Sequence, residues 1–293
     1  MVPVILTTDL EIANDYDFDG QRKALKILGD DLMKENMIFT VFTTADAAQL
    51  FGIELRELQQ RGIEIGCHGL AHRPEENYRH LKREVASKYI KEATRQIKEI
   101  VGESPVSFRG PRMSTSSVLQ KILVEEGYTA ESSVCPQRLD FMNSKGGDIR
   151  WLTAPRMPYH PSEENPYKKG NTNLLEIPLS SFLLPFISGV LYITGLRFMK
   201  VLFNLFYRES KQTGKPVVYL FHTYEFSEYT SGGKNSRTGS ERSRYSLHNF
   251  YSKKSRDRYR ANIELIQYMK SFNDVEFFTC REYTKYYNER KSV

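Results

Sequence analysis

The sequence has few of the residues that build disulfide-rich, zinc-finger or membrane-spanning proteins. Its 293 residues include only three cysteines, Cys67, Cys135 and Cys280, which lie far apart and form no CxxC pair. We therefore expect neither a disulfide framework nor a zinc finger, and a reducing compartment is the simpler interpretation. One apolar, uncharged stretch, Phe182–Leu196, has 15 residues and is interrupted by Pro185 and Gly189. A membrane-spanning helix needs about 20 apolar residues, so this stretch is too short for one.

The chain also lacks a strong excess of charge. Its 42 basic and 36 acidic residues leave a net charge of +6, with a pI near 9.0. A balance this mild does not indicate nucleic acid as a partner, and no nucleic-acid-binding motif accompanies it. The N-terminus has no basic region and no small-residue cleavage site, which predicts the absence of a secretory signal. We therefore expect a cytoplasmic protein.

Two segments stand apart from the rest. Phe182–Leu196 is followed by Arg197, Lys200 and a further apolar run, which favours buried or groove-lining structure but also suits docking on the inner face of a membrane. Ser231–Arg260 carries nine basic residues against two acidic ones. That segment is either a solvated loop and helix face or a contact with anionic lipid head groups or a phosphorylated carrier.

Short apolar runs alternate with longer amphipathic stretches, which predicts βα units around a mostly parallel sheet. The expected strands are 2–7, 37–43, 62–67, 106–109, 128–134, 174–178, 217–222 and 275–279. The expected helices are 20–36, 45–61, 84–101, 116–126 and 252–272. No internal repeat or long linker interrupts the pattern, so one domain over residues 1–293 is expected.

A pair of histidines follows directly after the expected strand 62–67. His68 and His72 are four residues apart, and on a helical turn two imidazoles at this spacing face the same way, which suits a divalent metal. Two partly buried structural histidines would give the same pattern. Adjacent Cys67 is expected to be a small core residue rather than a ligand.

Ionisable residues also follow three other expected strands. Asp9 and Glu11 come after the first, and in an extended chain they point to the same side, where they would meet a metal or another cation. The alternative is an Asp helix cap followed by a solvent-facing Glu. Arg109 and His222 end two later strands. Acids, a histidine pair, an arginine and a histidine at strand carboxyl ends form the layout expected of the active face of a barrel enzyme.

Six stretches, in this order, resemble motifs of the polysaccharide deacetylase (NodB-homology) family and span nearly the whole chain. They are TTDLE at 7–11, GCHGLAH at 66–72, FRGPR at 108–112, GYTAESSV at 127–134, EIPLS at 176–180 and LFHTYEF at 220–226. The first is similar to the Asp-x-Glu variant of the opening motif, because Leu10 stands where the usual second Asp would be. The second is similar to the metal-binding His-x-x-x-His motif.

The resemblance implies an α/β fold, a distorted (β/α) barrel with about seven parallel strands. It also implies a single divalent metal ion, most commonly zinc. By the same resemblance Glu11, His68 and His72 would be the metal ligands and Asp9 the general base. Because the first motif is altered, Asp9 remains an alternative to Glu11 as the acidic ligand.

The remaining site residues follow from the same resemblance. Arg109 would pair with Asp9 and hold it ionised, and His222 would be the general acid. Glu131 would orient or tune His222. Arg112, which replaces the usual aromatic residue, would contact substrate, as would Tyr224.

These roles imply a metal-dependent hydrolase that removes an N-acetyl group from an amino sugar, in a glycan or a lipid-linked precursor. Two alternatives remain open at this stage. One is a metal-dependent amidohydrolase acting on a small non-sugar amide, and the other is a non-catalytic glycan-binding homologue that has lost its metal.

Overall fold

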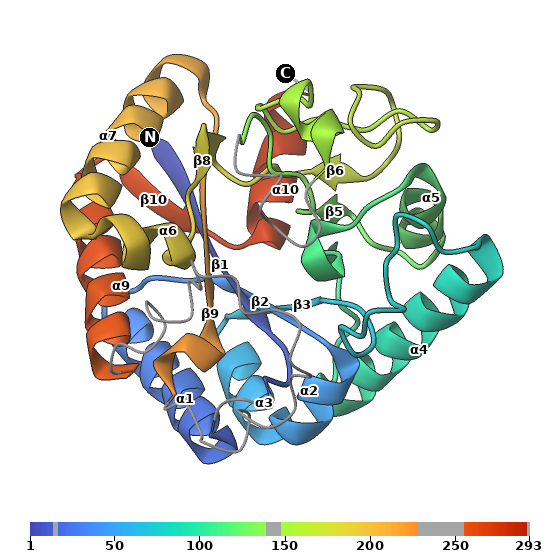
Figure 1. The fold of residues 1–293 in the computed structure, drawn as a ribbon, viewed down its shortest axis with the longest axis horizontal. Helices are drawn as coiled ribbons and strands as arrows, with labels where there is room; N and C mark the ends of the chain where they lie inside the picture. The colour runs from blue at the N-terminus through green and yellow to red at the C-terminus, as the bar shows by residue number, and fades with distance from the viewer. Residues whose placement is uncertain (14–16, 139–147, 228–254, 292–293) are drawn as a thin grey trace, which may run out of the picture.

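A parallel β-sheet curls through the centre of the molecule, and helices surround it (Figure 1). The structure is a computed structural model that describes residues 1–13, 17–138, 148–227 and 255–291. The strands of its main sheet are β1 (Val2–Leu10), β2 (Thr40–Thr43), β3 (Glu64–Cys67), β4 (Ser107–Phe108), β5 (Ala130–Glu131), β6 (Leu175–Glu176), β9 (Val217–His222) and β10 (Val275–Phe278).

Within the described residues these strands form one eight-stranded sheet in which every pairing is parallel. The order is β10-β1-β2-β3-β4-β5-β6, and β9 pairs with β1 as well. Parallel strands connected by helices carry their carboxyl ends to one face. The expected distorted (β/α) barrel is therefore confirmed.

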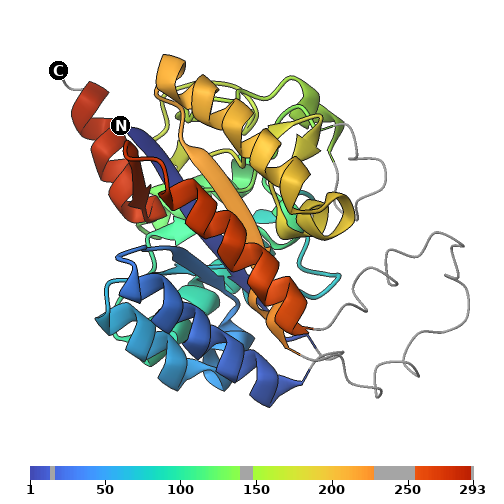
Figure 2. The same ribbon diagram turned by 90° about the vertical axis from the view of Figure 1, so that its left-hand side faces the viewer.

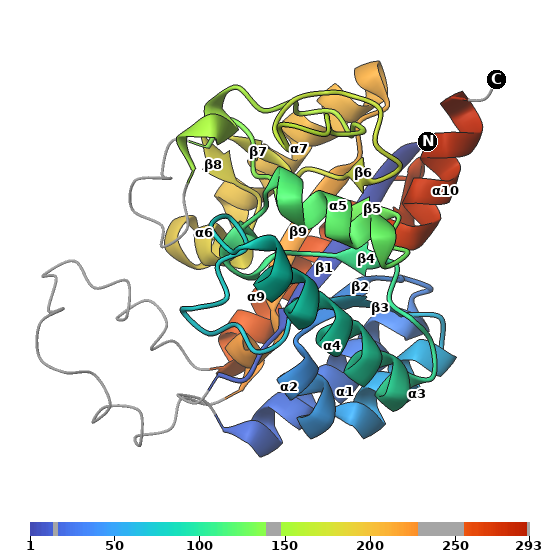
Figure 3. The same ribbon diagram turned by 90° about the vertical axis from the view of Figure 1, so that its right-hand side faces the viewer.

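The helices are α1 (Phe18–Lys34), α2 (Ala45–Leu50), α3 (Gly52–Gln60), α4 (Arg83–Val101), α5 (Ser117–Glu125), α6 (Ser188–Thr194), α7 (Leu196–Thr213), α9 (Ser255–Lys270) and α10 (Cys280–Lys291). Most of them pack on the outer side of the sheet, as the two side views show (Figures 2 and 3), whereas α10 packs on the inner face, in one buried cluster with Ile5 and Val218. Short 3-10 turns are η1 (Pro111–Met113), η3 (Ile149–Leu152) and η4 (Thr223–Phe226), and β7 (Ser181–Phe182) and β8 (Leu184–Pro185) form an antiparallel hairpin.

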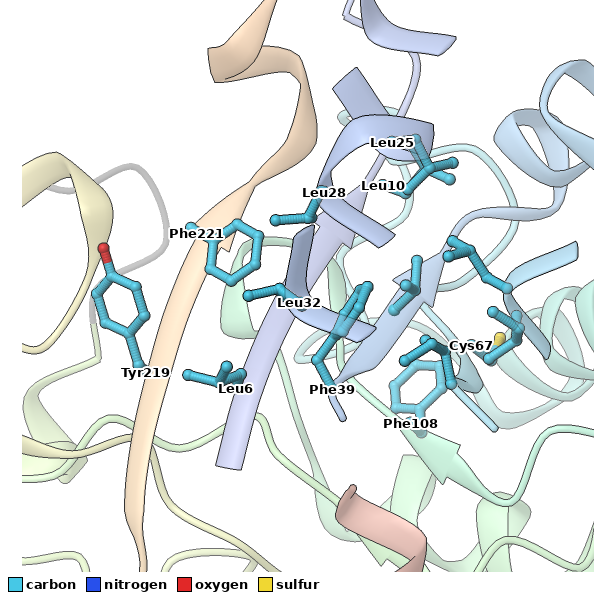
Figure 4. Packing of buried hydrophobic residues seen from close by; sticks show 14 of the residues in the cluster. Leu6, Leu10, Leu25, Leu28, Leu32, Phe39, Cys67, Phe108, Tyr219 and Phe221 are labelled. Carbon is cyan, nitrogen blue, oxygen red and sulfur yellow. The ribbon is translucent and has the colours of Figure 1, made fainter. Parts of the chain in front are cut away.

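The packing of α1 against β1 sets the side on which the acidic residues of β1 lie. Leu25, Leu28 and Leu32 of α1 are almost fully buried, and Leu10 of β1 points toward the same cluster (Figure 4). Burial of one such leucine stabilises the fold by about 2 kcal/mol. Because neighbouring residues of a strand point to opposite faces, Leu10 in the core places Asp9 on the inner face of the barrel.

Several expected boundaries were wrong. β1 continues to Leu10 instead of ending at Thr7, so Asp9 lies on the strand itself. The expected helix 45–61 is two helices, divided at Phe51, whose ring is buried and whose backbone (φ −111°, ψ 24°) leaves the helical region. Phe182–Leu196 forms the β7–β8 hairpin and α6, and α7 and α10 were not predicted at all.

The charge-rich segment Ser231–Arg260 is described only from residue 255 onward, so most of that expectation lies outside the described residues. Among the helices that the structure describes, none has the length and apolar character required to cross a membrane.

Candidate active site

Asp9 and His222 lie side by side on two neighbouring parallel strands. They are register partners at the carboxyl ends of β1 and β9. Asp9 is 5% exposed, and the side chain of His222 is 25% exposed. A buried acid therefore lies beside a histidine that solvent can reach, at the face where barrel enzymes carry their chemistry.

Arg109 neutralises Asp9. Its Nη1 donates to Asp9 Oδ1 at 2.9 Å and to Thr7 Oγ1 at 3.0 Å, and the arginine itself is completely buried. Its guanidinium also lies 4.4 Å from the ring centre of Phe42. The pairing that the resemblance implied is therefore present. A buried charge pair of this kind requires every remaining donor to be satisfied.

Ser132 supplies the remaining partners of that guanidinium, a role that the sequence did not suggest. Arg109 Nε donates to the Ser132 carbonyl at 2.9 Å, and Nη2 donates to Ser132 Oγ at 3.0 Å. The next residue, Ser133, accepts a hydrogen bond from the Gly110 amide at 2.9 Å. The serine pair of the GYTAESSV stretch thus fixes the direction of the Arg109 side chain.

The surroundings of Asp9 keep its carboxylate ionised. Burial alone would raise the pKa of Asp9, but the positive charge of Arg109 and the nearby His68 and His222 outweigh it, so the pKa is lowered. Asp9 Oδ2 also lies 3.8 Å from His68 Nε2. Because Arg109 binds Oδ1, the Oδ2 atom of this ionised carboxylate can accept a proton at neutral pH.

Glu11, His68 and His72 form a cluster of potential metal ligands. One donor atom from each lies within 4.8 Å of the other two. His72 Nδ1 is 3.1 Å from Glu11 Oε2, and the two imidazole rings have centroids 5.3 Å apart. One carboxylate and two imidazoles are a donor set that suits zinc and other first-row divalent ions.

Two details of this cluster fit a bound cation. His68 Nδ1 lies 2.8 Å from the Arg109 carbonyl, which only accepts, so Nδ1 donates to that carbonyl and Nε2 is the ring nitrogen left to face the cluster. Among the residues that the structure describes, buried Glu11 Oε2 has no hydrogen-bond partner, although His72 Nδ1 is close. Burial is the largest effect on the pKa of His72 and lowers it, which keeps that ring neutral as a ligand must be.

Cys67, next to this cluster, is fully buried, and burial raises its thiol pKa to about 12. A thiol that stays protonated is a poor ligand. The expectation that Cys67 is a core residue agrees with this placement.

The histidine pair does not lie on a helical turn, contrary to the expectation. Residues 68–72 form a loop after β3 in which Gly69 has φ +82° and His72 has φ +55°. Glu76 holds this loop, because its buried carboxylate accepts from the amides of Leu70, Ala71 (2.8 Å) and His72 (2.9 Å). The Glu76 carboxylate accepts hydrogen bonds from three backbone amides that a helical turn would otherwise satisfy, and in this way it orients His72 toward the cluster.

Arg112 closes the same loop from outside. Its Nη2 donates to the carbonyl of Arg73 at 2.8 Å and reaches that of Glu76 at 3.3 Å. The guanidinium that we expected to contact substrate is therefore engaged with loop carbonyls. Direct contact of Arg112 with substrate stays a prediction.

Glu225, rather than Glu131, is the carboxylate beside His222. His222 Nδ1 lies 3.3 Å from Glu225 Oε1, and the His222 amide donates to Oε2 at 3.3 Å. Glu225 also accepts from Ser188 Oγ at 2.9 Å and Tyr192 OH at 3.0 Å, one turn apart on α6. Burial lowers the pKa of His222, but Glu225 more than compensates and the pKa rises to about 9.

Glu131 occupies a different part of the interior. Its Oε2 accepts from Gln120 Nε2 at 2.9 Å, and its charge acts on Glu176, whose Oε1 accepts from the amides of Ser133 and Val134. Burial raises the pKa of both carboxyl groups. The prediction that Glu131 orients His222 is therefore wrong, because strand β5 turns that side chain toward Gln120.

Tyr224 lies at the edge of the site. Its ring centre is 5.1 Å from that of His222, and it is partly exposed. This placement is consistent with the expected contact to a sugar ring, which stays a prediction.

Known proteins resemble this chain in sequence pattern and in fold. The sequence profile of the polysaccharide deacetylase family matches residues 16–130. No curated protein matches the sequence. A structure assigned as a polysaccharide deacetylase from Mycobacterium smegmatis has a TM-score of 0.66 at 17% identity and covers 99% of this chain and 91% of its own.

Two further solved structures are similar over nearly the whole chain. One, assigned as a polysaccharide deacetylase from Pseudomonas aeruginosa PAO1, has a TM-score of 0.60 at 15% identity and covers 98% of this chain and 91% of its own. The other, the PuuE allantoinase, has a TM-score of 0.58 at 16% identity and covers 98% of this chain and 90% of its own. Identities this low show the fold alone, and the profile over residues 16–130 supports the family resemblance seen in the sequence motifs.

Proposed function

We propose that the chain acts as one catalytic domain over residues 1–293 and hydrolyses the N-acetyl group of an amino sugar with the help of a divalent metal ion. One observation carries the proposal. An ionised acid, Asp9, is held by buried Arg109 between a Glu-His-His cluster and a histidine whose pKa is raised to about 9. This arrangement supplies a base, an acid and a cation site at one face.

The two side chains would divide the proton transfers of amide hydrolysis. Asp9 accepts a proton from the attacking water while the water oxygen bonds to the amide carbon. His222, protonated at neutral pH, then gives its proton to the nitrogen as the C–N bond breaks, which releases a free amine and acetate. A divalent ion held by Glu11, His68 and His72 would polarise the carbonyl and lower the pKa of water at the site.

Arg109 has a positioning role in this scheme. It fixes Asp9 through Oδ1, which leaves Oδ2 directed toward His68 and the cluster. Asp9 is already paired with Arg109, whereas Glu11 Oε2 has no hydrogen-bond partner in the described part of the chain, so we assign Glu11 as the acidic ligand.

The substrate class is part of the proposal. The family profile supports an acetylated polysaccharide as the substrate, and we include a lipid-linked sugar in the proposal. An amidohydrolase of small, non-sugar amides is the second candidate, because an allantoinase has the same fold over 98% of this chain. We further propose a cytoplasmic location and no role for nucleic acid.

Metal analysis combined with substrate assays tests the proposal. Purified protein should contain about one divalent ion per chain, and His68→Ala and Glu11→Ala should lose it. The protein should release acetate from N-acetylglucosamine oligomers, and a chelator should stop the release. Turnover of a cyclic ureide but not of these oligomers would favour the second candidate. A protein that binds glycans without metal and without turnover would instead be a non-catalytic homologue.

A further inference from the structure

Exposed apolar side chains are concentrated on α6, α7 and the β7–β8 hairpin. Thirteen large hydrophobic side chains are exposed in the described residues, and six of them fall between residues 182 and 205. These six define the docking patch: Phe182 (47%), Leu183 (49%), Ile193 (47%), Phe198 (41%), Val201 (58%) and Leu205 (48%). Single exposed apolar residues need no explanation, but a concentration in one short segment indicates a surface that binds something.

Helix α7 has apolar residues on two faces. Its inner face buries Met199, Leu202, Phe203 and Phe206 against the rest of the protein. Phe198, Val201 and Leu205 follow the spacing i, i+3 and i+7, so they form a second stripe along the exposed side. The packing of α7 in this fold does not use that stripe.

The stretch of chain that carries the docking patch has charges of one sign. Residues 177–208 contain no aspartate or glutamate but do contain Arg197, Lys200 and Arg208. Arg197 and Arg208 are exposed, and the next acid along α7, Glu209, is paired with Arg156 at 2.7 Å. Large apolar side chains interspersed with exposed cations complement a bilayer that carries anionic lipids.

The docking patch lies close to the candidate site. α6 and the start of α7 are on the side of the molecule where β1 and β9 end (Figures 2 and 3). α6 also places Ser188 and Tyr192 on Glu225, the partner of His222. A surface that covers the docking patch would therefore lie on the same side of the molecule as the catalytic residues of the proposed reaction.

We propose that the docking patch seats this protein on an anionic membrane surface, with the candidate site turned toward sugars carried at that surface. Docking itself stands on the exposed side chains and the charge pattern. Only the nature of the sugar substrate rests on the proposed function.

Vesicle sedimentation tests the docking. The full chain should sediment with vesicles of phosphatidylcholine mixed with phosphatidylglycerol, and binding should weaken in pure phosphatidylcholine and at high salt. Val201→Ser combined with Leu205→Ser should weaken binding about tenfold or more. The matched control is Ile27→Ser combined with Ile53→Ser, exposed residues on α1 and α3 that should leave binding unchanged.

A charge variant separates the two parts of the interaction. Arg197→Gln with Arg208→Gln should weaken binding to the mixed vesicles about fivefold for each cation removed, with little effect on binding to pure phosphatidylcholine. Acetate release from a soluble substrate should be the same in all these variants.

Three results would overturn the inference. They are failure to bind mixed vesicles, binding that survives the Val201 and Leu205 changes, and a concentration-dependent dimer that those changes abolish in the absence of lipid. The last would assign the docking patch to a second copy of the chain. Sedimentation needs no turnover, so a failure here leaves the proposed hydrolase unaffected, and an inactive protein can still dock.

Discussion

Asp9 and His222 are paired in register on adjacent parallel strands, β1 and β9. Neighbouring strands lie about 4.8 Å apart, so the separation of these two residues is set by the sheet rather than by a loop. Strand positions hold side chains more precisely than loops do. The proposed base and acid therefore lie on strands that fix their positions, whereas the candidate ligands His68 and His72 depend on a loop that other residues must hold.

The Asp9→Asn variant should lose activity and keep its metal. The amide cannot accept a proton, so kcat should fall by about 10²- to 10⁴-fold. Buried Arg109 would then lack its anion, which lowers the free energy of unfolding by about 3 kcal/mol. Activity should therefore be measured at a temperature where circular dichroism shows folded protein.

Asp46→Asn is the control for Asp9→Asn. Asp46 is partly exposed and lies 3.6 Å from exposed Arg73, so its loss should change neither activity nor stability by much. Loss of the metal in Asp9→Asn would show that Asp9, and not Glu11, is the acidic ligand.

The alkaline limb of the pH profile should depend on Glu225. The pKa of His222 is raised to about 9, so His222 carries its proton below that pH and kcat/KM should fall as the pH rises through it. Glu225→Gln removes the negative charge and should move this limb down toward pH 6.5 or below.

Tyr192→Phe gives a graded comparison, because it removes one of the hydrogen bonds to Glu225 without removing the charge. Its alkaline limb should shift less than that of Glu225→Gln. If Glu225→Gln kept the limb near pH 9, the group that titrates would not be the His222–Glu225 pair.

The barrel could be predicted from the sequence because its strands are short, buried apolar runs that end in ionisable residues. The Val217–His222 strand was predicted with its observed bounds, and the Leu25–Leu28–Leu32 face of α1 is buried. α7 was missed because Phe198, Val201 and Leu205 are apolar on its exposed side. An additional apolar stripe obscures the period of 3.6 residues by which a helix is recognised.

The residues of the candidate metal cluster could be predicted as well, but the residues that hold them in place could not. The histidine spacing and the acids of the first strand stand out in the sequence, and the structure brings Glu11, His68 and His72 together. Glu225 and Glu76 act through contacts that only the folded chain defines. Glu76 in particular gave no signal, since an acid four residues after a histidine is common on any polar loop.

Glu76→Gln should weaken metal binding without abolishing it. The amide side chain keeps an oxygen acceptor but loses the charge that collects three backbone amides, so the loop that carries His72 should become less ordered. Outer residues of metal sites affect affinity by about 10- to 100-fold, and we expect a loss in that range by competitive chelator titration. Glu75→Gln, an exposed neighbour, is the control and should bind metal normally. Equal affinities in the two variants would remove Glu76 from the site.

Gly69→Ala should cost more stability than its backbone conformation alone explains. Gly69 has φ +82°, and a Cβ there would collide with the carboxylate of Glu76. Gly62 has φ +90° but open space around it, so Gly62→Ala measures the conformational cost by itself, about 1 to 2 kcal/mol. Denaturant unfolding should show a clearly larger loss for Gly69→Ala, because Glu76 must move and release amides of the 68–72 loop. The same variant should also bind metal more weakly, while Gly62→Ala should not. Similar losses in both variants would mean that Glu76 can move aside freely, and the loop would then not depend on it.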